Sequence, residues 1–141
     1  MTKNFEKEFY KNAFITHGRG DVQSLGWGSK KSQEIRFKIA SEIGISQGDS
    51  VLDVGCGYAD FHGYLVLKEI EVKYTGIDVN AFFIDVVKKE QPGLKVHCES
   101  ITTHSKKNIK YDWVIASGVF CFNEKEWEKA AYNKIKKMLL C

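Results

Sequence analysis

The chain has 141 residues, 43% of them hydrophobic and 28% charged, and a net charge of +3. This length suits one domain, and the composition is that of an ordinary globular protein. The net charge is too small to indicate nucleic acid as a partner. No apolar run approaches the ~20 residues that cross a bilayer, and Met1–Asn12 lacks the apolar centre of a signal peptide. We therefore expect a soluble, cytoplasmic protein without a membrane partner.

The four cysteines form neither a CxxC pair nor the spacing of a zinc finger. They are Cys56, Cys98, Cys121 and Cys141. We expect free thiols in a reducing compartment and no metal site. The densest basic stretch, residues 106–110, lies between expected elements and is interpreted as a solvated loop.

Four apolar runs predict strands, and the segments between them have the spacing of helices. The strands are expected at Val51–Val54, Val72–Ile77, Leu94–Cys98 and Trp113–Ala116. This alternation predicts an α/β fold built from βαβ units around a parallel sheet. Right-handed crossovers, with a reversal at the first strand, give the strand order 3-2-1-4 and helices on both faces.

Apolar residues that recur on one face locate the helices. In Ser29–Gly44 the recurring residues are Ile35, Ile39 and Ile43, and the glycine can end the helix. Asn80 can cap a helix over Ala81–Glu90, whose buried stripe is expected to be Phe83, Val86 and Val87. A further helix is expected over Glu124–Leu139.

The clearest functional signal lies in Val51–Asp60, where a strand runs through Asp53 into Gly55 and Gly57 and then into a helix. Glycine is needed where a ligand approaches the backbone more closely than a Cβ atom permits. About 20 residues on, the next strand ends in Asp78, whose carboxylate can accept hydrogen bonds from a ribose. Together these features indicate a site for an adenosine-containing cofactor. The alternative is a tight turn, with Asp78 as a helix cap.

The residue that opens the next helix helps to select the cofactor. Dinucleotide sites need a small residue there, whereas this chain has Asp60. At ~6 Å each like-charge pair with a pyrophosphate would cost about 3 kcal/mol. An acidic loop instead suits S-adenosyl-L-methionine, whose ammonium and sulfonium groups are positive.

The segment Asp53-Val54-Gly55-Cys56-Gly57 resembles the D-x-G-x-G signature of class I S-adenosylmethionine-dependent methyltransferases. The resemblance runs from about Ser29 to the end of the chain and implies a three-layer, Rossmann-like fold. It implies that Gly55, Cys56 and Gly57 lie against the methionine part of the cofactor, with Asp53 orienting the loop. It also implies that Asp78 holds the ribose, with Val79 beside it.

The resemblance implies three weaker assignments. Glu99 and Ser100, after the third strand, would meet the adenine, and Ala116 and Ser117, after the fourth, would border the cofactor. Each could equally be an ordinary loop residue. Arg36 could pair with the cofactor carboxylate, the alternative being a surface arginine at the helix edge.

Two domains follow from this interpretation: an N-terminal segment, residues 1–28, and an S-adenosylmethionine-binding domain, residues 29–141. The first is a possible lid or substrate-side helix, and Trp27 there is either a lid or an anchor. We expect methyl transfer to a small-molecule acceptor. A catalytically silent cofactor-binding module and, more distantly, an NAD-dependent oxidoreductase are the alternatives. His17 and His104 have the chemistry of a base but are interpreted as solvated, so no catalytic residue is assigned.

The family's full domain continues with further strands, so the chain is expected to lack the last strands of the fold. Such a form would leave the fourth strand as an open edge, with Trp127, Ile135 and Met138 partly bare. Because open edges and bare apolar patches recruit other chains, we expect a possible homodimer.

Overall fold

The computed structural model describes residues 29–117 and 125–139, without the side chains at 125–128 and 131, and positions 8, 9, 12, 15, 16 and 18. Expectations for His17, Trp27, Cys121, the Trp127 side chain and Cys141 fall outside the described residues. The chain forms two compact units, Met1–Ile43 and Gly44–Cys141. The division expected after residue 28 stays a prediction.

Helix α2 (Lys30–Glu42) belongs to the first unit and begins where predicted. The Ser29 side chain caps it by accepting a hydrogen bond from the Ser32 amide at 3.1 Å. The isoleucine stripe does not form the buried face, since Ile35, Ile39 and Ile43 are 48% to 60% exposed. Gln33 and Phe37 are buried instead, one turn apart on nearly the opposite side. The four-residue repeat identified the helix but not which of its faces is covered.

The second unit contains a four-stranded parallel sheet in the order β3-β2-β1-β4, as predicted. The strands are β1 (Ser50–Val54), β2 (Lys73–Asp78), β3 (Val96–Cys98) and β4 (Trp113–Ile115). Strand β1 is central, so the loop that follows it lies where the strand order reverses. Open α/β sheets bind ligands at this point, outside the carboxyl ends of the strands.

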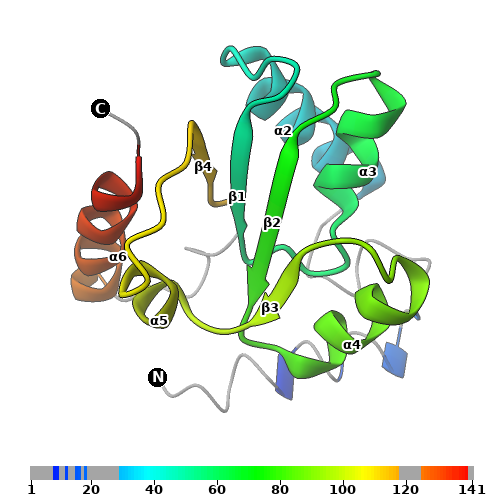
Figure 1. Cartoon of the computed structure of the whole chain (residues 1–141). Helices are drawn as coiled ribbons and strands as arrows, with labels where there is room; N and C mark the ends of the chain where they lie inside the picture. The colour runs from blue at the N-terminus through cyan, green and yellow to red at the C-terminus, as the bar shows by residue number, and fades with distance from the viewer. Residues whose placement is uncertain are drawn as a thin grey trace. The chain divides into compact units, whose positions relative to one another are not determined.

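Helices cover both faces of this sheet: α3 (Asp60–Leu67) and α4 (Ala81–Glu90) on one, α5 (Ile101–Ser105) and α6 (Lys125–Met138) on the other (Figure 1). Because side chains alternate along a strand, successive residues of one strand pack on opposite faces of the sheet and so belong to different hydrophobic clusters. Leu52 joins a cluster with Ile101 and Met138. Tyr74 joins a second cluster with Ile84 and Val87. The predicted three-layer architecture is confirmed.

Two details of the expected packing are wrong. The buried stripe of α4 contains Ile84 in place of Val86, because Phe83, Ile84 and Val87 share one face. Met138 is 1% exposed rather than partly bare, since α6 packs it into the cluster beneath β1 and β2. Within the described residues β4 itself pairs with β1 alone, but just before it Tyr111 forms a parallel bridge with Leu139, and its amide donates to the Met138 carbonyl at 2.8 Å.

Candidate functional site

The glycine loop after β1 is tied to β2 by three backbone amides. The amides of Gly55 and Cys56 donate to the carbonyl of Ile77 at 2.8 and 3.0 Å. The amide of Gly57 donates to the Asp78 carboxylate at 3.0 Å. These three hydrogen bonds hold the loop against the end of β2.

The backbone of the loop repeatedly takes positive φ angles. Gly55 has a φ of +72° and Gly57 one of +54°, followed by Ala59 at +59°. Glycine adopts this region without steric cost, whereas a side chain at Gly57 would be strained. These turns bring the chain from β1 into α3 within a few residues, leaving backbone without Cβ atoms at the carboxyl end of the sheet.

Cys56 faces inward from this loop and is 7% exposed. A Cβ atom on Gly76 of β2 would lie 2.9 Å from its sulfur, so the strand needs glycine there for the loop to pack. Because the thiol is buried, Cys56 can contribute to a ligand site only through its backbone. Cys56 and Cys98, the cysteines within the described residues, are both free thiols.

Asp53 is a buried carboxylic acid directly beneath the loop. The hydroxyl of Tyr74 donates to its Oδ2 at 2.6 Å. Burial raises the pKa of Asp53 to about 7, and the charges of Asp78 and Asp60 act in the same direction, while the hydrogen bond from Tyr74 opposes them. Burial and the neighbouring Asp53 likewise raise the pKa of Tyr74.

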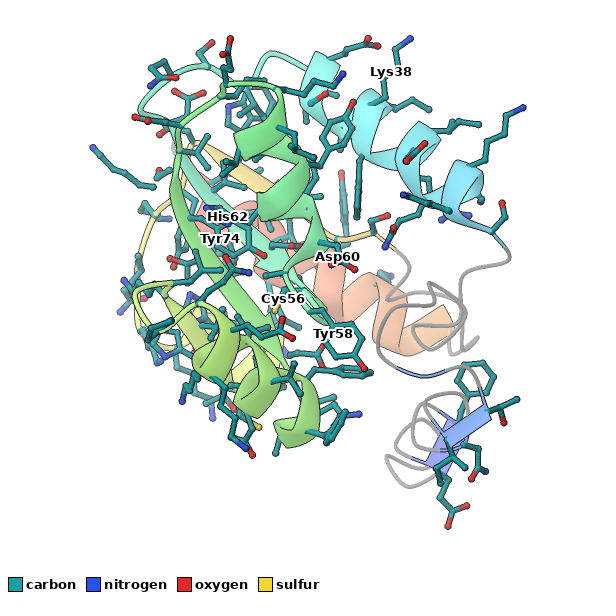
Figure 2. All side chains as sticks on the ribbon, turned by 90° about the vertical axis from the view of Figure 1, so that its right-hand side faces the viewer. Lys38, Cys56, Tyr58, Asp60, His62 and Tyr74 are labelled. Carbon is teal, nitrogen blue, oxygen red and sulfur yellow. The ribbon has the colours of Figure 1, made fainter. Side chains whose placement is uncertain are left out.

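Three carboxyl groups thus influence one another around the loop: Asp53 below it, Asp60 in the first turn of α3 and Asp78 at the end of β2. Figure 2 shows Cys56, Tyr58 and Asp60 gathered at the loop, with Tyr74 beside the ring of His62. Such an arrangement disfavours an anionic ligand and favours a cationic one. The acidic surroundings expected from Asp60 therefore extend to the whole loop.

Asp78 does not cap α4. Asn80 does so, accepting a hydrogen bond from the Phe82 amide at 3.0 Å, as predicted. The Asp78 carboxylate instead accepts from the amides of Gly57 and Asn80, at Oδ2 and Oδ1. Each carboxylate oxygen has two lone pairs, so a carboxylate can accept from more donors than these two amides.

Glu99 and Ser100 follow β3 at the same edge of the sheet. Ser100 caps α5 through a hydrogen bond from the Thr103 amide at 3.2 Å. Glu99 Oε1 lies 2.6 Å from His104 Nδ1 and 2.8 Å from Lys107 Nζ. Burial opposes ionisation of Glu99, but the hydrogen bonds from Lys107 and His104 outweigh it and hold its pKa below the usual value.

The interpretation of His104 as a solvated histidine is wrong. Its side chain is 1% exposed, and its Nε2 lies 2.8 Å from the Tyr111 hydroxyl. The neighbours of His104 in the sequence are polar, but α5 is oriented so that the His104 side chain is buried beneath the sheet. Tyr74 was also missed, although parallel pairing of β1 with β2 would have placed it near Asp53.

The remaining predicted residues lie in different places. Val79 follows β2 and is 42% exposed, whereas Ala116 packs against the cluster beneath β4. Ser117 comes next, partly exposed at the carboxyl end of β4. Arg36 is an exposed residue of α2 in the first unit, and its part in the site stays a prediction.

A parallel sheet whose order reverses at a glycine loop, with an acidic residue ending the second strand, defines a Rossmann-like nucleotide-binding architecture. A profile of the methyltransferase domain family matches residues 51–140, which is most of the chain. The chain belongs to this family, as the sequence resemblance implied. No curated protein sequence is significantly similar to it.

Solved structures share this fold at low sequence identity. A cyclopropane synthase from Mycobacterium tuberculosis has a TM-score of 0.67 and 17% identity over 79% of this chain and 40% of that one. Magnesium protoporphyrin IX methyltransferase from Synechocystis, with bound SAH (S-adenosylhomocysteine), has a TM-score of 0.69 and 14% identity over 96% of this chain and 64% of that one. A TehB-like SAM-dependent methyltransferase from Corynebacterium glutamicum has a TM-score of 0.63 and 20% identity over 97% of this chain and 68% of that one. The chain therefore spans 40% to 68% of the length of these proteins.

Proposed function

We propose that this chain binds S-adenosyl-L-methionine at the carboxyl ends of β1 and β2 and takes part in methyl transfer to a small-molecule acceptor. The observation that carries the proposal is the glycine loop tied to Asp78 and surrounded by carboxyl groups. A loop of this kind accommodates a ligand against bare backbone and favours a positive charge. Membership of the methyltransferase domain family and the SAH-bound relative support the same cofactor.

We propose the following roles for individual residues. Gly55 and Gly57 would lie against the methionine part of the cofactor, and Asp78 would accept from the ribose hydroxyls. Glu99 and Ser100 would meet the adenine, with Val79 beside it. Ala116 and Ser117 would border the site at the end of β4, and Arg36 would pair with the cofactor carboxylate.

When bound, the cofactor supplies a methyl group on a sulfonium, which is already a good leaving group. The protein therefore has mainly to align the acceptor and exclude water, which is catalysis by proximity. Asp53 and Tyr74 would hold the loop in shape from below, since their hydrogen bond joins β1 to β2 beneath it. We assign no general base.

Calorimetric titration with S-adenosylhomocysteine and with NAD tests the proposal. Binding of the first and not the second is expected, and the reverse would support an oxidoreductase. Turnover of labelled S-adenosylmethionine with a panel of metabolites then separates an active enzyme from a cofactor-binding but catalytically silent module. Labelled product with a macromolecule and with none of the small molecules would contradict the acceptor class.

We also propose that the protein works in the cytoplasm and forms a homodimer. The feature that supports self-association is the edge of β4 away from β1, where the described residues supply a single bridge, between Tyr111 and Leu139. No helix in the described ranges has both the length and the apolar character needed to cross a membrane. Sedimentation at micromolar concentration decides the oligomeric state, and a clean monomer would refute the dimer.

A further inference from the structure

A chain of buried polar side chains runs beneath the sheet and ends at Glu99. It begins at Thr75 in the middle of β2, whose side chain acts to lower the pKa of the Tyr111 hydroxyl. That hydroxyl lies 2.8 Å from His104 Nε2, and His104 Nδ1 lies 2.6 Å from Glu99 Oε1. Thr75, Tyr111 and His104 are each 3% exposed or less.

The chemistry of the groups orders the protons along this chain. Glu99 is ionised because its pKa is lowered, so it can only accept, and His104 Nδ1 must donate to it. In a neutral ring Nε2 is then an acceptor, and the Tyr111 hydroxyl donates a hydrogen bond to it. Both ring nitrogens thus have a partner, so the tautomer and orientation of His104 are fixed by the fold.

The far end of this chain lies at the candidate site. Strand pairing places Cys98 beside Asp78, and Glu99 is the next residue after Cys98. His104 and Lys107 both contact Oε1 of Glu99, and no described residue hydrogen bonds Oε2. Glu99 therefore presents one anchored and one available carboxylate oxygen, one residue beyond the strand position paired with Asp78.

We propose that His104 is a positioning residue that holds Glu99 Oε2 ready to accept a hydrogen bond from the amine of the adenine. The inference rests on the proposed function, since it deepens the role of the same site. His104 acts through Glu99 and does not contact the cofactor. The preference of the site for a purine with an amine would therefore depend on Tyr111 and Thr75, which are buried beneath the sheet.

Lys107 is not an equivalent support. Its side chain is 41% exposed, and an exposed lysine contributes little to holding a carboxylate in one orientation. His104 is buried on every side and has one geometry available. Removal of the lysine and removal of the histidine should therefore have different consequences for Glu99.

The test compares the affinities of two ligands by calorimetry: S-adenosylhomocysteine and its 6-deamino analogue, in which hydrogen replaces the purine amine. The wild type should prefer the first by about tenfold or more, the usual value of a hydrogen bond to a charged group. His104→Leu should bring the ratio close to one. His104→Asn, which retains a donor near Nδ1, should restore much of it, and Lys107→Met should leave it largely unchanged.

The outcomes separate failure of the proposed function from failure of the role given to His104. A wild type that binds neither ligand refutes the proposed function, whereas equal affinity for both refutes only the role given to Glu99 and His104. A folded His104→Leu variant with an undiminished ratio overturns the inference. If His104→Leu does not fold, Tyr111→Phe decides, because it keeps the imidazole and removes the hydroxyl that holds its Nε2 in place. The ratio should fall in Tyr111→Phe, and an unchanged ratio overturns the proposal.

Discussion

The carboxylate of Asp78 accepts a hydrogen bond from the amide of Gly57 at 3.0 Å, which joins the end of β2 to the glycine loop after β1. The two residues that the sequence singled out for separate roles are thus parts of one structure. Asp78 shapes the loop as well as offering oxygen atoms to a ligand. A substitution there is expected to act on both.

Asp78→Ala should weaken the binding of S-adenosylhomocysteine by roughly ten- to a hundredfold, because it removes hydrogen bonds to a charged group. Asp78→Asn is the matched control, since its one oxygen can still accept from either the Gly57 or the Asn80 amide, and its loss of affinity should be smaller. Titration calorimetry on both variants measures the effect. A folded Asp78→Ala protein with wild-type affinity would show that the ribose assignment is wrong.

Gly57→Val should abolish cofactor binding and leave the sheet folded. The φ of +54° at Gly57 is strained for any side chain and worst for a β-branched one, so a stability loss of about 1–2 kcal/mol is expected. Circular dichroism and chemical denaturation report the fold, and calorimetry reports binding. Gly93→Val, at a position with open space and no positive φ, is the control that should bind normally. Retained binding in Gly57→Val would argue against contact between cofactor and loop.

The sequence was sufficient for features that depend on local pattern. The apolar runs predicted all four strands of the described residues, and the spacing from Gly57 to Asp78 indicated that these two residues lie together, because parallel strands end at one edge. Features that depend on tertiary packing were not accessible. Nothing in the sequence around His104 distinguishes a buried histidine from a solvated one, since its partner Tyr111 is brought to it by the turn after α5. The buried face of α2 was missed for the same reason.

Glu69→Gly should stabilise the second unit by about 0.5–1 kcal/mol. Glu69 is exposed, has a φ of +59°, and lies just after α3, where its amide donates to Val66 and the next amide donates to Leu65. This is the helix end at which glycine removes the cost of a left-handed residue. Lys68→Gly, one residue earlier with a φ of −90°, is the control and should be destabilising. Urea denaturation measures both, and an unstable Glu69→Gly variant would contradict the argument.

Asp53→Asn should make the free energy of unfolding less dependent on pH. Burial raises the pKa of Asp53 from 3.8 to about 7. Between these values the folded state holds a proton on Asp53 that the unfolded state has lost. The stability contribution of this group therefore falls as pH rises, by up to about 1.4 kcal/mol per pH unit. Below this window both states are protonated and above it both are ionised, so the contribution is flat on either side.

The measurement is the difference in unfolding free energy between wild type and Asp53→Asn at several pH values. Taking the difference cancels the other groups that titrate in the same range, such as Glu99. Asparagine keeps an oxygen that can accept from the Tyr74 hydroxyl, so the difference should move steadily in favour of the variant from pH ~4 to ~7. Tyr74→Phe should extend the window upward, because the hydrogen bond that it removes lowers the pKa of Asp53. Parallel pH profiles for wild type and Asp53→Asn would show that Asp53 is ionised in the folded protein throughout.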